Sequence, residues 1–197
     1  CYNTKLKDEG HARRIAEHCI RSGHGRNLEF ADLTVKISGI SARMGRELYT
    51  HIQGVSRVQS STRYINYQDF NYYIPSELKG EGLEVYTQTM EYIQEAYGKL
   101  KELGYKNDIT GYLLPLAMDT TIILKINARA LEHLAEMRMC TRALKEFRDF
   151  MNLFKQEISK LDEEWNWIAE NLMKPKCDKL GYCNEDYGCG RVKKRGE

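Results

Sequence analysis

The stretch LTVKISGISARMGREL, residues 33–48, holds the two periodicities that decide the fold. Val35 and Ile37 alternate with polar neighbours, and this period of two is typical of a β-strand with one buried face. Met44 and Leu48 continue the apolar series at a step of four, which predicts that a helix follows the strand directly. The stretch therefore indicates an α+β protein.

Helices are predicted on both sides of this stretch, from apolar residues spaced three and four apart. An amphipathic helix over residues 8–21 is expected to end at Ser22-Gly23. A second stripe runs from Leu83 to Leu100, and Gly104 is placed to cap its helix. The intervening residues 55–73 carry no helical stripe and are dense in polar side chains, so we predict an extended or looped segment.

Two further helices are predicted in the C-terminal half. Leu116–Met137 is rich in apolar residues and follows Pro115, which suits the first turn of a helix. The longest stripe runs from Leu144 to Leu172 and predicts one helix of roughly eight turns, ended before Pro175. Long apolar seams on two helices predict oligomerisation through helices.

Composition narrows the class of protein. The chain has 197 residues, 42% of them hydrophobic and 29% charged, which fits one globular domain over residues 1–197 with a Cys- and Gly-rich tail at 173–197. No apolar run approaches the roughly 20 residues that span a bilayer, and no secretory signal opens the sequence, so we expect a cytoplasmic protein. A formal charge of +2 argues against a dedicated nucleic-acid binder.

The cysteines of the tail do not match a metal site. Cys177, Cys183 and Cys189 are evenly spaced and contain no C-x-x-C pair, whereas zinc sites need four ligands, often as tighter pairs. We interpret them as structural thiols and predict no metal, with zinc and disulfides as the less favoured alternatives.

One candidate site lies in the polar segment Gln59-Ser60-Ser61-Thr62-Arg63-Tyr64. If this segment is extended, Ser61 and Arg63 point to the same side and offer a hydroxyl and a guanidinium to one ligand. The pair suits a phosphate or a pyrimidine carbonyl. A polar surface loop with its own turn hydrogen bonds is the alternative.

A second candidate site is expected on the helix predicted after Pro115. Arg129 and His133 are four residues apart and share one face, and Asn127 and Arg138 share another. Two polar faces on an apolar helix indicate contacts with a ligand or with another subunit. A solvated or salt-bridged face explains the same pattern.

These segments together resemble the flavin-dependent thymidylate synthases. Landmarks of that family recur in order along most of the chain, namely Cys1-Tyr2, Ser22-Gly23-His24 with Leu28-Glu29, Ile37-Ser38-Gly39, Ser61-Thr62-Arg63-Tyr64, Leu113-Leu114-Pro115, Asn127-Ala128-Arg129-Ala130-Leu131 with His133, Met137-Arg138, and Glu146-Phe147-Arg148.

The chain departs from the family's pattern at several positions. The R-H-R signature begins at His51 or has His51 at its centre, depending on the register, and both of its arginines are absent. The arginine before the family's L-P is Gly111 here, the His of L-E-H is Phe30, and the Trp of W-E-I-R is Lys145. Basic residues that could supply the missing charge are Arg43, Arg46 and Arg57.

The resemblance implies an α+β fold in which long helices pack with a small, mostly antiparallel sheet. It also implies a homotetramer that transfers a one-carbon unit from methylenetetrahydrofolate to dUMP, using FAD that NADPH reduces. The residues implied for dUMP are Gln59, Ser60, Ser61, Arg63 and Arg138, with Ser61 and Arg138 in the catalytic centre and Ser61 not assigned as a nucleophile. Those implied for FAD are His51, Asn127, Arg129 and His133.

Two other functions stay open on these residues. A related enzyme could transfer one carbon to a pyrimidine nucleotide with altered flavin use. A non-catalytic paralogue could bind a partner subunit or nucleic acid, an idea to which the basic run Arg191–Arg195 gives slight support.

Overall fold

The computed structural model describes residues 5, 7, 8 and 10–196, so the Cys1-Tyr2 landmark lies outside the described residues. Helices and strands follow one another as α1 (His11–Arg21), η1 (Gly25–Phe30), β1 (Asp32–Ser41), α2 (Ala42–Leu48), β2 (Val55–Gln59), α3 (Glu81–Glu102), α4 (Asn107–Thr110), η2 (Gly111–Leu113), β3 (Asp119–Asn127), α5 (Ala128–Arg138), α6 (Lys145–Ile158), α7 (Glu163–Leu172) and α8 (Lys176–Leu180). No helix in these described ranges is both long and apolar enough to cross a bilayer.

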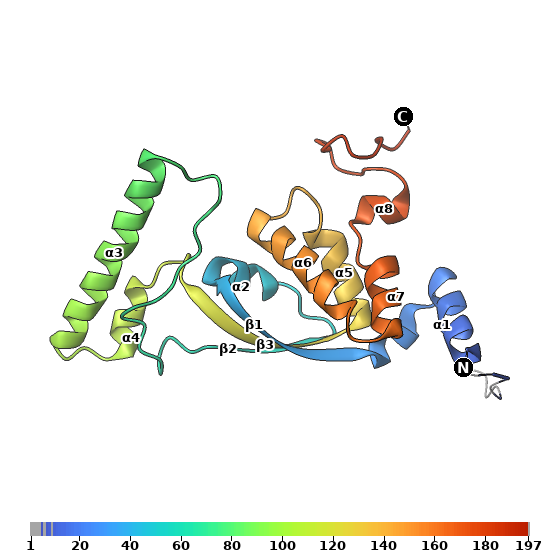
Figure 1. The fold of residues 1–197 in the computed structure, drawn as a ribbon, viewed down its shortest axis with the longest axis horizontal. Coiled ribbons are helices and arrows are strands. Elements are labelled where there is room, and N and C mark those ends of the chain that lie inside the picture. Colours follow the sequence, from blue (N-terminus) through green and yellow to red (C-terminus); the bar gives the residue numbers. More distant parts are fainter. Residues whose placement is uncertain (1–4, 6, 9, 197) are drawn as a thin grey trace.

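The strands form one antiparallel sheet in the order β1-β3-β2, so the last strand in sequence lies in the middle. The sheet separates two groups of helices: α3 and α4 stand at one end of the molecule, and α5 to α8 at the other (Figure 1). The predicted fold class, long helices with a small antiparallel sheet, is confirmed, as are the strand and helix over residues 33–48 and the helix capped at Gly104.

The helix predicted over Leu116–Met137 is wrong in its first half, because residues 119–127 form the central strand β3. Consecutive β-branched residues favour an extended chain here. Burial alternates along the strand, with Thr120, Ile122 and Leu124 facing the core. Pro115 lies in a turn, where its carbonyl accepts a hydrogen bond from Met118 N.

The single helix predicted over Leu144–Leu172 is also wrong. It is broken between Ile158 and Glu163 into α6 and α7. The apolar stripe continues across the break, but Asp162 accepts a hydrogen bond from Trp165 N at 2.7 Å and so begins a new helix. The two helices bury the halves of the stripe in different places: α6 packs into the main core, and Ile168 and Leu172 of α7 join a smaller cluster with Leu28 and Ala128.

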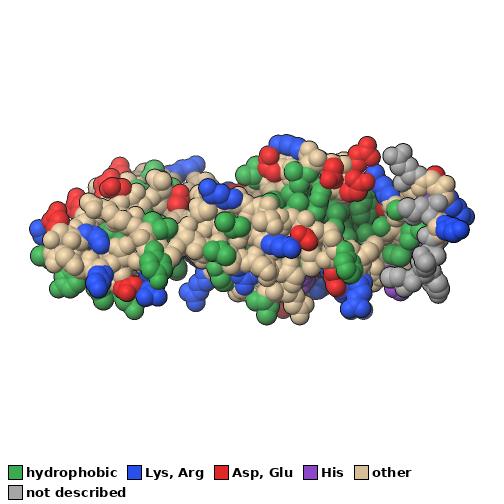
Figure 2. All heavy atoms as spheres, turned by 90° about the horizontal axis from the view of Figure 1, so that it is seen from below, with side chains coloured by type: hydrophobic (Ala, Val, Ile, Leu, Met, Phe, Trp, Pro, Cys, Tyr) green, Lys and Arg blue, Asp and Glu red, His purple; other side chains and the backbone are tan. Residues whose placement is uncertain are grey.

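Helices α2, α5 and α6 cover one face of the sheet and leave the other open (Figure 1). The core between them consists of side chains from all three strands and from these helices, among them Met44, Leu48, Ile122, Leu124, Ile126, Leu131, Leu134, Phe147, Met151 and Ile158. On the open face Val58 and Ile123 pair across the strands and are 69% and 51% exposed. Hydrophobic side chains lie among Lys and Arg side chains when the molecule is viewed from this side (Figure 2).

Helix α3 stands apart from the main core. A smaller cluster around Phe70, Met90 and Met118 holds it to the looped segment and to the start of β3. Its opposite face carries Tyr92, which is 71% exposed, together with exposed Val85 and Leu103. This helix therefore has a second apolar face that the described part of the chain leaves uncovered.

The tail packs back on α5. Lys179 of α8 forms ion pairs with Glu132 at 2.5 Å and with Glu136 at 3.0 Å. Cys177, Cys183 and Cys189 are free thiols, of which Cys183 is buried.

A buried carboxylate ties the β1–α2 junction to α6. Glu146 accepts hydrogen bonds from the backbone N–H and from the hydroxyl of Ser41, both at 2.6 Å. The same Ser41 hydroxyl accepts a hydrogen bond from Met44 N at 3.0 Å and so caps α2. One side chain of α6 therefore sets where α2 begins.

We expect Glu146→Ala to lower the free energy of unfolding by about 3 kcal/mol, because it removes two charge-assisted hydrogen bonds and leaves the buried Ser41 N–H unsatisfied. Urea denaturation at fixed protein concentration measures the change. Glu157→Ala, an exposed position on the same helix, is the control and should alter stability little. Equal stability of the two variants would contradict the role given to Glu146.

Candidate functional site

A cavity of about 780 Å³ opens between η1, the α2–β2 loop and the start of α5. The four residues that the resemblance implies for a flavin all line it, although they come from two distant segments. His51 follows α2, and the other three belong to the β3–α5 region. The complete lining is Glu29, Thr50, His51, Ile52, Gln53, Gly54, Val55, Asn127, Arg129, Ala130 and His133.

The sequence predicted that Asn127 lies on a helical face, and this prediction is wrong. Asn127 is the last residue of β3 and caps α5, because its side-chain oxygen accepts a hydrogen bond from Ala130 N at 2.9 Å. Its side chain also lies against Gly54, where a Cβ would come within 2.6 Å of it. Gly54 has a φ of +67°, so both the space and the backbone at this position require glycine. Asn127 thereby shapes the wall of the cavity.

Arg129 and His133 share a face of α5, as predicted, and both lie beside carboxylates. Arg129 forms a short ion pair with Glu29 of η1. His133 Nδ1 lies 3.9 Å from Glu136, and its ring meets the His51 ring edge-on at a centroid distance of 6.1 Å. The cavity thus presents a guanidinium, two imidazoles and the amides of Gln53 and Asn127.

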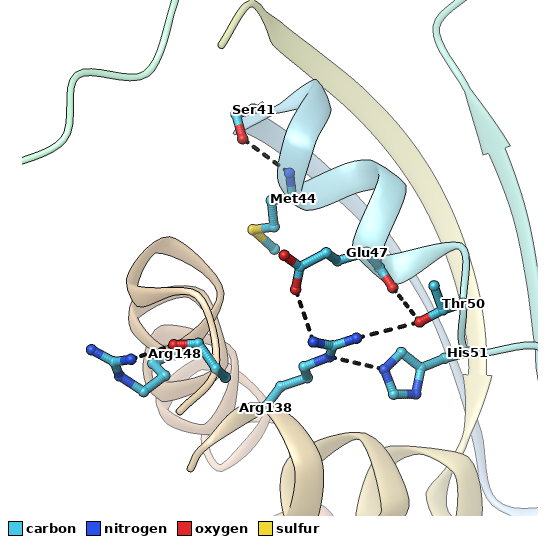
Figure 3. Close-up of polar contacts among 8 residues, drawn as sticks. Ser41, Met44, Glu47, Thr50, His51, Arg138 and Arg148 are labelled. Atoms are coloured by element: carbon cyan, nitrogen blue, oxygen red, sulfur yellow. Dashed lines mark hydrogen bonds and ion pairs between the residues drawn. The ribbon is translucent and has the colours of Figure 1, made fainter. Parts of the chain in front are cut away.

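Arg138 lies beside this cavity at the end of α5 and is held on three sides (Figure 3). It donates to Glu47 at 2.8 Å, to His51 Nε2 at 3.0 Å and to Thr50 Oγ1 at 3.3 Å. The guanidinium also lies 5.0 Å from the centre of the Phe147 ring. With its side chain only 19% exposed, Arg138 is a fixed charge at the edge of the cavity.

His51 is neutral in this arrangement. Burial is the main cause that lowers its pKa from 6.5 to about 4, and the positive charge of Arg138 lowers it further, as do His133 and Arg57. Because Nε2 accepts the hydrogen bond from Arg138, the ring proton is on Nδ1. His51 can therefore donate from Nδ1 while it orients Arg138.

The polar segment after β2 lies elsewhere. Ser61 and Arg63 are not extended side by side, because Ser61 Oγ accepts a hydrogen bond from Arg63 N at 3.2 Å in a turn. Arg63 points to α4, where its Nε donates to Asp108 at 2.8 Å. The prediction that both side chains face one ligand from a strand is therefore wrong; the turn was the alternative.

Gln59 and Ser60 are held to β3. Gln59 donates to the Thr120 hydroxyl at 3.0 Å, and Ser60 donates from its backbone and its hydroxyl to the Thr121 carbonyl. Gln59 is the last residue of β2 and Ser60 follows it, at the end of the strand that points away from the cavity. Four residue steps of a strand span about 13 Å, so the residues implied for dUMP, Arg138 excepted, lie well apart from the residues implied for FAD.

Several residues that hold the site in place were not assigned from the sequence. Glu29, Glu47 and Asp108 each form an ion pair with an arginine singled out above. Glu29 belongs to the Leu28-Glu29 landmark but was given no role, and nothing in the local pattern marks Glu47 or Asp108. Of the three arginines considered as replacements, Arg57 donates to the Tyr49 and His51 carbonyls and lies over the Tyr49 ring, so it supports the loop. Arg43 and Arg46 are exposed on α2.

Comparisons with known proteins identify relatives over most of the chain. The family model described as thymidylate synthase complementing protein matches residues 1–162. The flavin-dependent thymidylate synthase of Thermococcus kodakarensis is 36% identical over 83% of this chain and 69% of its own. That of Pyrococcus furiosus is 31% identical over 90% of this chain and 73% of its own.

Solved structures share the fold. Thymidylate synthase X of Helicobacter pylori, crystallised with FAD and dUMP, matches with a TM-score of 0.68 and 22% identity. The match covers 87% of this chain and 86% of that one. At this identity the likeness establishes the fold alone.

The pKa of His51 tests the geometry around Arg138. NMR titration of its ring should give a pKa near 4, and Arg138→Gln should raise it toward 6.5 by removing one of the charges that lower it. Because the folded-state pKa is lowered, the unfolded chain binds this proton more readily between about pH 6.5 and 4. Protonation of His51 in the unfolded chain therefore lowers the free energy of unfolding as the pH falls through that window.

Arg46→Gln removes an exposed arginine from the same neighbourhood and should leave the titration of His51 unchanged. A pKa near 6.5 in the unmodified protein would contradict the buried, neutral ring.

Proposed function

The chain belongs to the thymidylate synthase complementing protein family, and from this premise we propose that it is a flavin-dependent thymidylate synthase. In this proposal it transfers a one-carbon unit from methylenetetrahydrofolate to C5 of dUMP. NADPH regenerates the reduced FAD. The names of the relatives support the reaction, and the FAD and dUMP in the Helicobacter pylori structure support the ligands.

The observation that carries the proposal is the convergence of His51, Asn127, Arg129 and His133 on one cavity. Their donor groups fit a flavin nucleotide, because a guanidinium and imidazole N–H groups suit phosphate oxygens and the carbonyls of an isoalloxazine ring. The volume of about 780 Å³ is in the range of cofactor sites. Reduced FAD supplies the hydride, and the protein supplies alignment and charge.

The protein's own groups are prepared for charged ligands. Arg129 is oriented by Glu29, and Arg138 by Glu47, Thr50 and His51, so neither guanidinium needs to be ordered when a ligand arrives. We assign Arg138 to dUMP, at the edge of the flavin cavity. A nucleotide bound by Arg138 would lie next to a flavin in this cavity, as hydride transfer requires.

Within one protomer, most of the residues implied for dUMP lie apart from the residues implied for FAD. The cavity lies at the start of β2, and the residues implied for dUMP, Arg138 excepted, lie at or beyond its far end, namely Gln59, Ser60, Ser61 and Arg63. We therefore propose a homotetramer in which the turn of one protomer faces the cavity of another. The exposed apolar face of α3 with Val85, Tyr92 and Leu103 supports this assembly, since burial of such a face stabilises association.

We further propose that residues 1–197 act as one domain. The contacts of Lys179 with Glu132 and Glu136 support this, because they hold the tail to the helix that carries the flavin residues.

Flavin content tests the function directly. The purified protein is expected to be yellow, with about one FAD per protomer, and to form dTMP from dUMP when methylenetetrahydrofolate and NADPH are supplied. Arg129→Gln should weaken FAD binding tenfold or more, because it removes charge-assisted hydrogen bonds of about 1.5–3 kcal/mol. Lys99→Gln is the control: it also removes one positive charge, but from an exposed surface of α3, and should leave FAD binding unchanged.

A protein that stays colourless after incubation with FAD would overturn the proposal. If it then binds dUMP, a related one-carbon transferase becomes the better assignment, and if it binds neither ligand, a non-catalytic paralogue does.

Assembly is tested by light scattering. The protein is expected at four times the mass of one chain, and Tyr92→Glu should reduce that mass by placing a charge in the apolar face of α3. Glu91→Gln, at the neighbouring exposed position, should leave it unchanged. A tetramer that tolerates Tyr92→Glu would show that this face is not the interface.

A further inference from the structure

A second cavity, of about 330 Å³, lies where the turn after β2 meets α3 and α4. Three segments line it: the turn contributes Arg63 and Tyr64, the end of α3 contributes Lys101, and the start of α4 contributes Lys106, Asn107 and Asp108. Three cationic side chains in so small a space make it strongly basic.

The charges in this cavity do not cancel. Arg63, Lys101 and Lys106 supply three positive charges and Asp108 one negative, so the lining has a net charge of 3 − 1 = +2. The hydrogen bond from Arg63 is the main cause that lowers the pKa of Asp108, and the nearby charge of Lys106 adds to it. Arg63, Lys106 and Asp108 are therefore close enough to influence one another's charge.

Donor groups in the cavity remain available to a ligand. Arg63 bonds Asp108 through Nε, and within the described residues its two terminal nitrogens make no hydrogen bond. Lys101 donates to Asn107 at 2.8 Å and to the Tyr105 carbonyl at 3.3 Å, which uses two of its three N–H groups. Lys106 is exposed, and its ammonium group makes no hydrogen bond or ion pair with any residue that the structure describes.

The turn that contributes Arg63 and Tyr64 to the cavity also lies against Gly111, the position that has lost the arginine of the family's pattern. Gly111 lies against the turn, because a Cβ built on it would meet the Thr62 carbonyl oxygen at 3.5 Å. Lys106 comes five residues earlier in the same segment, and Lys101 reaches into the same cavity from α3. The segment that lacks a positive charge at Gly111 thus carries one at Lys106, and Lys101 adds a second to the cavity.

We infer that Lys101 and Lys106, together with Arg63, form an oxyanion site that binds the phosphate of a nucleotide monophosphate. A phosphate monoester carries close to two negative charges at pH 7, which matches the net charge of the lining. The assignment of the nucleotide as dUMP rests on the proposed function. The oxyanion site itself rests on the cavity, its charge and its unused donors.

Calorimetry of the full chain with three ligands tests the site: dUMP, deoxyuridine and inorganic phosphate. Lys106→Gln and Lys101→Gln should each weaken dUMP binding about tenfold, the loss expected for one charge-assisted hydrogen bond. Deoxyuridine, which has no phosphate, should bind equally to all variants. Lys106→Arg should retain the affinity, and Lys99→Gln, which removes a lysine of α3 outside this cavity, should not alter it.

The outcomes separate this inference from the proposed function. If dUMP binds and both lysine variants match the unmodified protein, the oxyanion site is wrong and the function stands. If inorganic phosphate binds in a manner that depends on Lys106 while dUMP does not bind, the site stands and the function is wrong. If neither ligand binds, both are overturned.

Discussion

The contact between Ser41 and Glu146 is the constraint on which the site depends. Glu146 reaches from α6 to the point where β1 ends and determines where α2 begins. Helix α2 in turn places Glu47 and the loop with His51, and these hold Arg138 at the edge of the larger cavity. A buried hydrogen-bonded carboxylate that is not itself proposed to touch a ligand therefore sets the position of the central guanidinium.

Each arginine proposed to bind a ligand has a carboxylate partner in the same protomer. Arg138 pairs with Glu47, Arg129 with Glu29, and Arg63 with Asp108. Such pairs keep the guanidinium groups oriented and limit the repulsion among them when no ligand is present. The ligand's phosphates and carbonyls then need only the donors that the carboxylates leave unused.

The elements with one buried face were predictable from the sequence, because their periodicity records which side is covered. The strand around Val35 and the helix that carries Met90 are examples. Strand β3 was missed because the middle strand follows directly into α5 without a polar break. The turn between α6 and α7 was missed because the apolar residues keep their helical spacing across it. Only the cap at Asp162 marks the start of a new helix. The four cavity residues were found from the family's pattern, whereas an ion pair such as that of Arg138 with Glu47 joins distant segments and leaves no mark in the local sequence.

The turn that carries Arg63 and the cavity that contains Arg129 are separated by the length of β2, and this separation has a genetic consequence. In the proposed assembly each complete site takes its turn from one copy and its cavity from another. Two inactive alleles, one defective near Arg63 and the other near Arg129, would therefore restore some working sites when they are expressed together. A defect in the Ser41–Glu146 contact is not open to the same rescue, because it destabilises the whole copy that carries it and is not confined to one of the two regions.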